Sequence, residues 1–137
     1  YARLRGLDCS LFVDHGLVPQ QEAFEAMLCS DLLLVFGSMD PGIDFITTGK
    51  VLEYLGSRRP IVAVCNPSAA LAGLLREIGG GVVLTSETAI ETWLAGLARD
   101  PTKVIEELMA SRNDRCVQVY STPHTASLYD QLLRAIL

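Results

Sequence analysis

Short apolar runs alternate with longer amphipathic segments along this chain. The short runs are rich in branched and aromatic side chains, which predicts buried parallel strands at residues 9–13, 32–36, 61–64 and 82–84. Apolar residues recur at helical spacing in the longer segments, at residues 20–28, 49–55, 69–78, 85–98, 101–109 and 125–137. This alternation predicts βα units with right-handed crossovers, so the expected fold class is α/β, with a Rossmann-like parallel sheet and flanking helices.

Local signals refine three of these helices. In residues 20–28 the spacing predicts a buried stripe of Ala23, Phe24 and Met27. Ser68 is expected to cap the helix at residues 69–78, and Ser86 or Thr88 the helix at residues 85–98. The polar residues 111–115 are predicted to form a loop.

Composition and charge limit the classes of function. The chain has 137 residues, half of them apolar, which is enough for one domain with a buried core. Its net charge is −5 and its eleven Lys and Arg residues are scattered, so a nucleic-acid partner is not expected. A small anionic ligand remains compatible with this charge, because local amides and a single lysine can bind it.

The first residues predict a piece of a longer protein. Tyr1 stands where an initiator Met would be, and residues 1–8 resemble the end of a helix whose beginning is missing, so residues 1–137 are interpreted as one partial domain. The chain has no apolar run of the roughly eighteen residues that a membrane helix requires. We expect a cytoplasmic protein, with the membrane surface as an alternative location for the full-length protein.

The four cysteines form no Cys-x-x-Cys pair, and no histidine lies at metal-ligand spacing from them. Most are therefore predicted to be small buried thiols in a reducing compartment, and no metal or cofactor is expected.

The best candidate for a binding site is the start of the helix after residues 32–36. Ligands of parallel sheets bind at the carboxyl ends of strands, where this chain has loops at residues 14–19, 37–48 and 65–68. The second loop ends in Thr47 and Thr48, either of which can cap a helix, followed by Gly49 and Lys50. Free amides, the helix dipole and a lysine together favour a bound phosphate.

Glu53 lies three residues beyond Lys50 and could accept hydrogen bonds from the hydroxyls of a sugar. A simpler interpretation stands beside this one. The string Thr-Gly-Lys is common at helix starts, and Glu53 could be an ordinary solvated carboxylate.

Several strings in the chain together resemble a known family: Gly16-Leu-Val-Pro19, Ser30-Asp-Leu-Leu-Leu34, Thr48-Gly-Lys-Val-Leu-Glu-Tyr-Leu55 and Arg59-Pro-Ile-Val-Ala63. They are similar to the carboxyl-terminal half of GT-B glycosyltransferases of family 4, also called group 1. The likeness extends from about residue 3 to residue 137, and its most specific part runs from Lys50 to Ala63. In that family this half is a Rossmann-like domain that binds the nucleotide-sugar donor.

The resemblance implies a role for several residues. Glu53 would bind the ribose hydroxyls of the donor, as the second acidic residue of the family's Glu-x7-Glu motif. The amides of Thr48 and Gly49 would hold the diphosphate, and the loop of Leu17, Val18 and Pro19 would pack beside the nucleobase. The expected activity is retaining sugar transfer from a nucleotide-diphosphate sugar to an unknown acceptor, with no metal.

The chain also departs from the family pattern. The first acidic position of the motif, eight residues before Glu53, is occupied by Phe45. Asp44, one residue away, could replace it in contacting the donor sugar, or that contact could be lost. The family's basic pair for the diphosphate belongs to an earlier βα unit, and the amino-terminal half that binds the acceptor would have to come from elsewhere.

Two other interpretations remain open at this point. The chain could be a non-catalytic module that binds a nucleotide or a phosphometabolite, or a structural α/β domain in which Thr-Gly-Lys only caps a helix. The resemblance implies that two opening strands of the domain are missing from the sheet, so pairing of two copies through an exposed sheet edge is a further expectation.

Overall fold

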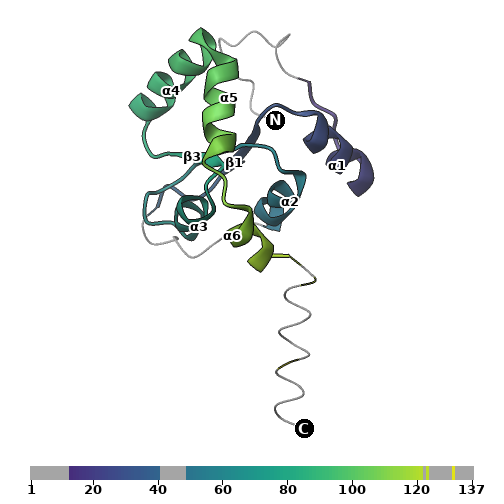
Figure 1. Ribbon diagram of the computed structural model, residues 1–137. Coiled ribbons are helices and arrows are strands. Elements are labelled where there is room, and N and C mark those ends of the chain that lie inside the picture. The colour runs from purple at the N-terminus through teal and green to yellow at the C-terminus, as the bar shows by residue number, and fades with distance from the viewer. Residues whose placement is uncertain (1–12, 41–48, 122, 124–130, 132–137) are drawn as a thin grey trace.

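The structure is a computed structural model that describes residues 13–40, 49–121, 123 and 131. The described part is α/β, with a parallel sheet in the order β1-β2-β3 and helices on both sides in a Rossmann-like arrangement (Figure 1). The strands are β1 (Leu33–Phe36), β2 (Ile61–Val64) and β3 (Gly81–Leu84). The helices are α1 (Gln20–Cys29), α2 (Gly49–Ser57), α3 (Ala70–Ile78), α4 (Glu87–Arg99), α5 (Pro101–Ala110) and α6 (Asp114–Val119). The predicted fold class is confirmed.

The register of the sheet places the strand beginnings side by side. Leu33 of β1 pairs with Ile61 of β2, which in turn pairs with Gly81 of β3. The carboxyl ends of the three strands therefore meet at one edge, as predicted for the site. The predicted strand at residues 9–13 is not confirmed: residues 9–12 lie outside the described residues, and Val13 is in no strand and 76% exposed.

Among the helices whose first residues and caps are described, α4, α5 and α6 begin at a polar side chain that accepts a backbone N–H. The Ser86 hydroxyl accepts from Ala89 N at 3.2 Å, which confirms one of the two predicted caps of α4. Asp100 caps α5, where its carboxylate accepts from Lys103 N at 3.1 Å. Asn113 caps α6 in the same way, so a short helix begins where a polar loop was predicted.

The predicted cap of α3 is wrong. This helix begins after Ala69, with no side-chain hydrogen bond at its cap. The Ser68 hydroxyl instead donates to the side-chain oxygen of Asn66 at 2.7 Å. Asn66 thus organises the loop after β2, which takes Ser68 away from the helix start.

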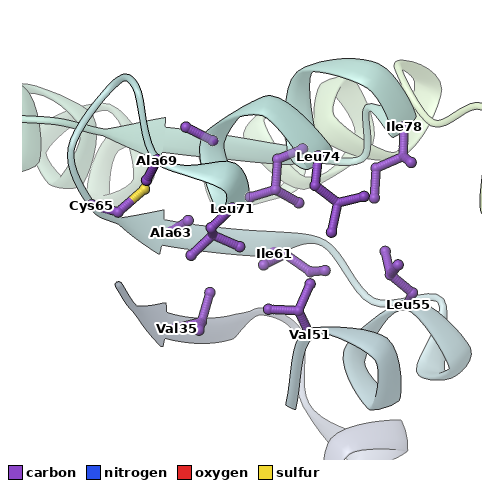
Figure 2. Packing of buried hydrophobic residues seen from close by; sticks show 12 residues of the cluster. Val35, Val51, Leu55, Ile61, Ala63, Cys65, Ala69, Leu71, Leu74 and Ile78 are labelled. Carbon is purple, nitrogen blue, oxygen red and sulfur yellow. The ribbon is translucent and has the colours of Figure 1, made fainter. Parts of the chain in front are cut away.

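The core lies on one face of the sheet, between β1 and β2 and the helices α2 and α3 (Figure 2). Val51 and Leu55 of α2 are buried there, at 0% and 3% exposure. The other members come from the strands, from the loop after β2 and from α3: Val35, Ile61, Ala63, Cys65, Ala69, Leu71, Ala72, Leu74, Leu75 and Ile78. Of the three cysteines in the described ranges only Cys65 is buried, so the prediction of mostly buried thiols is wrong there.

The apolar stripe predicted for α1 is not buried. Helix α1 packs against α2 and has no buried residue, and Phe24 remains 39% exposed. The stripe was expected to reach the core, but the described contacts place α1 beside another helix, where Ala23 and Met27 are only partly covered.

A turn between α5 and α6 joins the two sides of the molecule. Arg112 lies in this turn and its guanidinium donates to the Leu55 carbonyl at the end of α2, at 3.0 Å. Gly79 has a φ of +63°, and a Cβ there would lie 2.0 Å from the Ser111 carbonyl oxygen. Only glycine permits both this backbone conformation and this close approach, so Gly79 ends α3 and lets the turn pack against it.

Candidate functional site

Helix α2 holds the residues that the sequence assigns to the ligand. It is held in place by its buried face and by hydrogen bonds at its carboxyl end. Val51 and Leu55 anchor it in the core. At its carboxyl end the Ser57 hydroxyl donates to the Tyr54 carbonyl at 2.8 Å, and Arg112 donates to the Leu55 carbonyl. The side chains of Lys50 and Glu53 therefore project from a rigid support.

Gly49 and Lys50 open onto a hollow of about 320 Å³ beside β1. Leu34, Val35, Phe36 and Tyr54 complete its lining. Gly49 and Lys50 are exposed. Within the described residues, and apart from its own helix and chain neighbours, Gly49 has no atom within 4 Å of the position that a Cβ would take. No described side chain therefore fills the space beside Gly49 at the start of α2.

Tyr54 forms the wall of this hollow and ties it to β1. Its hydroxyl donates to the Leu34 carbonyl at 3.3 Å. Burial and, to a smaller extent, the charge of Glu53 raise the pKa of the Tyr54 phenol. The phenol consequently stays protonated at neutral pH and keeps its role as a donor.

Glu53 borders a second hollow, of about 300 Å³, between α2 and α1. The α1 residues that line it are Gln20, Gln21, Ala23, Phe24 and Met27. The hollow therefore has an apolar wall with amide and carboxylate groups around it. This combination is typical of small-molecule sites, in which a few polar groups orient an apolar ligand surface.

On its other side Glu53 borders a hollow of about 390 Å³ between α2 and α6. Leu52, Leu55, Gly56, Val117, Tyr120 and Ser121 also line it. The Tyr120 hydroxyl donates to Glu77 at 3.3 Å, and partial burial together with this carboxylate raises the pKa of the phenol. On α2 this hollow is lined by residues 52–56, and neither Gly49 nor Lys50 is among its lining residues.

The loops that follow β1 and β2 are joined at the carboxyl edge of the sheet. Asn66 N donates to the Ser38 carbonyl at 2.9 Å, and the Asn66 side-chain amide donates to the Met39 carbonyl at 3.3 Å. The loop before α1 has its own support, since the Asp14 carboxylate accepts from Gly16 N at 2.8 Å. Two of the three loops predicted to surround the ligand are thus in direct contact.

The structure places the predicted site residues in two groups. Gly49 and Lys50 line the hollow beside β1, whereas Glu53 lines the hollow beside α1. Val18 and Pro19 come immediately before Gln20, at the start of α1, and Val18 is 40% exposed. Thr48 and Asp44 lie outside the described residues, so their predicted roles stay predictions.

Sequence reasoning missed the contribution of α1. Gln20, Gln21 and Phe24 border the same hollow as Glu53, although Phe24 was predicted to belong to the core and the glutamines to no site. The useful signal was the spacing of four between Gln20 and Phe24, which places an amide and an aromatic ring on one helix face.

The described residues hold neither a metal site nor a membrane-spanning helix. They contain no group of three His, Cys, Asp or Glu side chains that could hold a metal ion. Within the same ranges, no helix has the length and apolar character needed to cross a membrane.

Comparisons with known proteins leave the site to be interpreted from its own chemistry. No protein-family model, no curated protein and no solved structure matched this chain.

Proposed function

We propose that this chain is the donor-binding domain of a glycosyltransferase, which transfers a sugar from a nucleotide-diphosphate sugar to an acceptor held by another part of the protein. The observation that supports it best is the order of groups along α2. An open helix start with Lys50 is followed, about 4.5 Å further along the axis, by Glu53. In a nucleoside diphosphate the pentose follows the phosphates in the same order.

The first turn of α2 suits the phosphates. The first N–H groups of a helix have no partner within the helix, and together with the positive end of the helix dipole they attract an anion. Lys50 adds a full charge at the same hollow. Because Val51 anchors this turn in the core, its amides are in place before the ligand arrives and could stabilise the charge that develops on a departing diphosphate. Glu53 would accept hydrogen bonds from the ribose hydroxyls and so orient the donor.

Binding of nucleoside diphosphates by the 137-residue chain tests the first part of this proposal. Titration calorimetry with the uridine, guanosine, adenosine and cytidine compounds should show saturable binding of at least one of them. Glu53→Ala should weaken it about tenfold or more, because a hydrogen bond to a charged group is lost. The same variant should leave the affinity for inorganic pyrophosphate unchanged.

Lys50→Ala should weaken both nucleotide and pyrophosphate binding, by about tenfold, since it removes the charge beside the phosphates. Glu91→Ala and Lys103→Ala are matched controls, because both residues are exposed and lie on α4 and α5, away from the hollows. Absence of saturable nucleotide binding by the unmodified chain would overturn the proposal. Equal losses in the Glu53 variant and in its Glu91 control would also contradict the ribose role.

Transfer itself separates an enzyme from a passive binding module. A longer protein that contains this chain should release free sugar or a glycosylated product from the donor that binds best. Binding without any such product would assign the chain to the non-catalytic alternative.

A further inference from the structure

The free edge of β1 carries backbone groups that point away from the rest of the sheet. In the described sheet β1 is an outer strand, and its partner there is β2. Leu33 N and Gly37 N both donate hydrogen bonds on the β2 side, at 2.9 Å each. Because backbone groups alternate in direction along a strand, those of Leu34 and Phe36 point to the opposite side.

One of these outward groups has a partner from a side chain. The Tyr54 hydroxyl donates to the Leu34 carbonyl at 3.3 Å. Within the described part of the chain, the Leu34 N–H and both backbone groups of Phe36 have no hydrogen-bond partner. Free strand edges are commonly protected by charged side chains or proline, but β1 consists of Leu, Val and Phe alone. The edge is therefore open to a further strand, and Tyr54 is its competitor.

The side chains of the same two residues are uncovered on the outer face of the sheet. Leu34 is 51% exposed and Phe36 is 67% exposed, whereas Val35 between them points into the core (Figure 2). A strand added at this edge would cover both side chains and pair the backbone groups beside them.

Beta strand β1 is complementary to a second copy of itself. If two β1 strands run antiparallel about a two-fold axis at Val35, Leu34 of each copy lies opposite Phe36 of the other. Such a pair exchanges two N–H···O bonds, so the two symmetric pairs satisfy all four outward groups in each copy. The pairing uses both free edges and stops at two copies.

We propose that this chain forms a symmetric dimer through antiparallel pairing of its two β1 edges. The proposal does not rest on the proposed function. Leu34 and Phe36 offer about 200 Å² of side-chain surface per copy, against the roughly 800 Å² that each partner of a stable dimer buries. The dimer is therefore weak, with a dissociation constant on the order of 100 µM. At the low micromolar concentrations of unfolding and binding experiments the chain is a monomer, and the hollow beside β1 stays open.

Sedimentation equilibrium of the 137-residue chain, from well below this concentration to well above it, should show a monomer–dimer equilibrium. Phe36→Lys should weaken the dimer at least tenfold, because it places a charge on the pairing edge. Val119→Lys is the matched control, since Val119 is also exposed, at 51%, but lies on α6. It should leave the dissociation constant unchanged.

Tyr54→Phe tests the edge in the opposite direction. It frees the Leu34 carbonyl for the second copy and should strengthen the dimer about fivefold, the effect of one hydrogen bond. Tyr120→Phe is its control, because that hydroxyl donates to Glu77 and not to β1. In the unmodified chain, NMR hydrogen exchange of the Leu34 and Phe36 amides should slow as the protein concentration rises.

Three results would each overturn the proposal: a monomer at every concentration, species larger than a dimer, or a dimer that a folded Phe36→Lys variant leaves intact. Circular dichroism shows whether that variant is folded. If it is not, the exchange of the two amides in the unmodified chain decides, and rates independent of concentration refute the pairing. None of these results changes the proposed function, because the ligand titrations are made on the monomer.

Discussion

The two faces of the sheet differ sharply in how well they are covered. On the face toward α2 and α3, Val35, Ile61 and Ala63 have exposures of 4%, 1% and 0%. On the opposite face, Leu34 and Phe36 of the same strand β1 are 51% and 67% exposed. There, α4 and the sheet enclose a hollow of about 310 Å³ whose lining is entirely apolar.

This difference shows where the stability of the candidate site originates. Helix α2, with Lys50 and Glu53, belongs to the covered face, and its inward side chains are fully packed. Parallel strands are apolar on both faces because both are normally covered by helices. In the described residues only the face toward α2 and α3 is fully covered. The candidate site lies on α2 and is therefore supported by that face.

The largest expected effect contrasts one residue from each face. Leu71→Ala should lower the free energy of unfolding by about 3 kcal/mol, because Leu71 is 1% exposed and its removal leaves a cavity. Phe36→Ala should lower the free energy of unfolding by less than about 1 kcal/mol, since most of that ring is already in solvent. Urea denaturation followed by circular dichroism measures both.

Equal losses for the two variants would contradict the comparison. They would mean that a further segment or a second copy covers the outer face in solution. Sedimentation of the Phe36 variant would then distinguish these cases, because only a second copy changes the molecular mass.

A glycine at the carboxyl edge sharpens the comparison further. A Cβ at Gly37 would lie 2.8 Å from Cys65 Cβ and 3.3 Å from a Leu71 methyl carbon, so Gly37→Ala should destabilise the fold by about 2 kcal/mol through overpacking. Gly73→Ala is the control: a Cβ there has no described atom of another element within 4 Å, so this change should raise the free energy of unfolding by about 0.5 to 1 kcal/mol. A neutral Gly37 variant would show that the covered face is looser than the structure indicates.

Much of the fold followed from local pattern alone. The strands β1, β2 and β3 were predicted because short apolar runs between helices have few alternatives in an α/β chain. The sequence could not show that α1 contacts α2 instead of the core, since an apolar stripe does not specify its partner. Ser68 failed as a cap because Asn66, two residues earlier, competes for its hydroxyl.

The site was predicted in part. Spacing placed Gly49, Lys50 and Glu53 on the first turns of one helix, and this is correct. The division into two hollows depends on how α1 and β1 flank α2, which is tertiary information. Gln20 was overlooked for the same reason, because its importance comes from a residue on a different helix.

A smaller effect is expected at the turn that links α6 to the covered face. Arg112→Ala should lower the free energy of unfolding by about 1.5 kcal/mol, because the Leu55 carbonyl loses its charged donor. Gly80 also loses the Arg112 side chain that packs against it. Arg115→Ala, an exposed neighbour on α6, should change stability by less than about 0.5 kcal/mol. Thermal unfolding of both variants checks this, and equal shifts would show that Arg112 does not anchor the turn.

The smallest expected effect is a pH dependence of the stability that the Arg112–Asp114 pair adds at the same turn. The Arg112 guanidinium donates to Asp114 at 2.7 Å, and this hydrogen bond and its charge lower the pKa of the carboxyl below its ordinary value of 3.8. A lowered folded-state pKa means that the contribution to stability is present above pH 3.8 and is lost as the pH falls through the folded-state value. Asp114→Asn should therefore be slightly less stable than the unmodified chain at neutral pH and equal to it in acid. A gap that stays constant across this range, or that persists in an Arg112→Ala background, would show that the ion pair does not cause it.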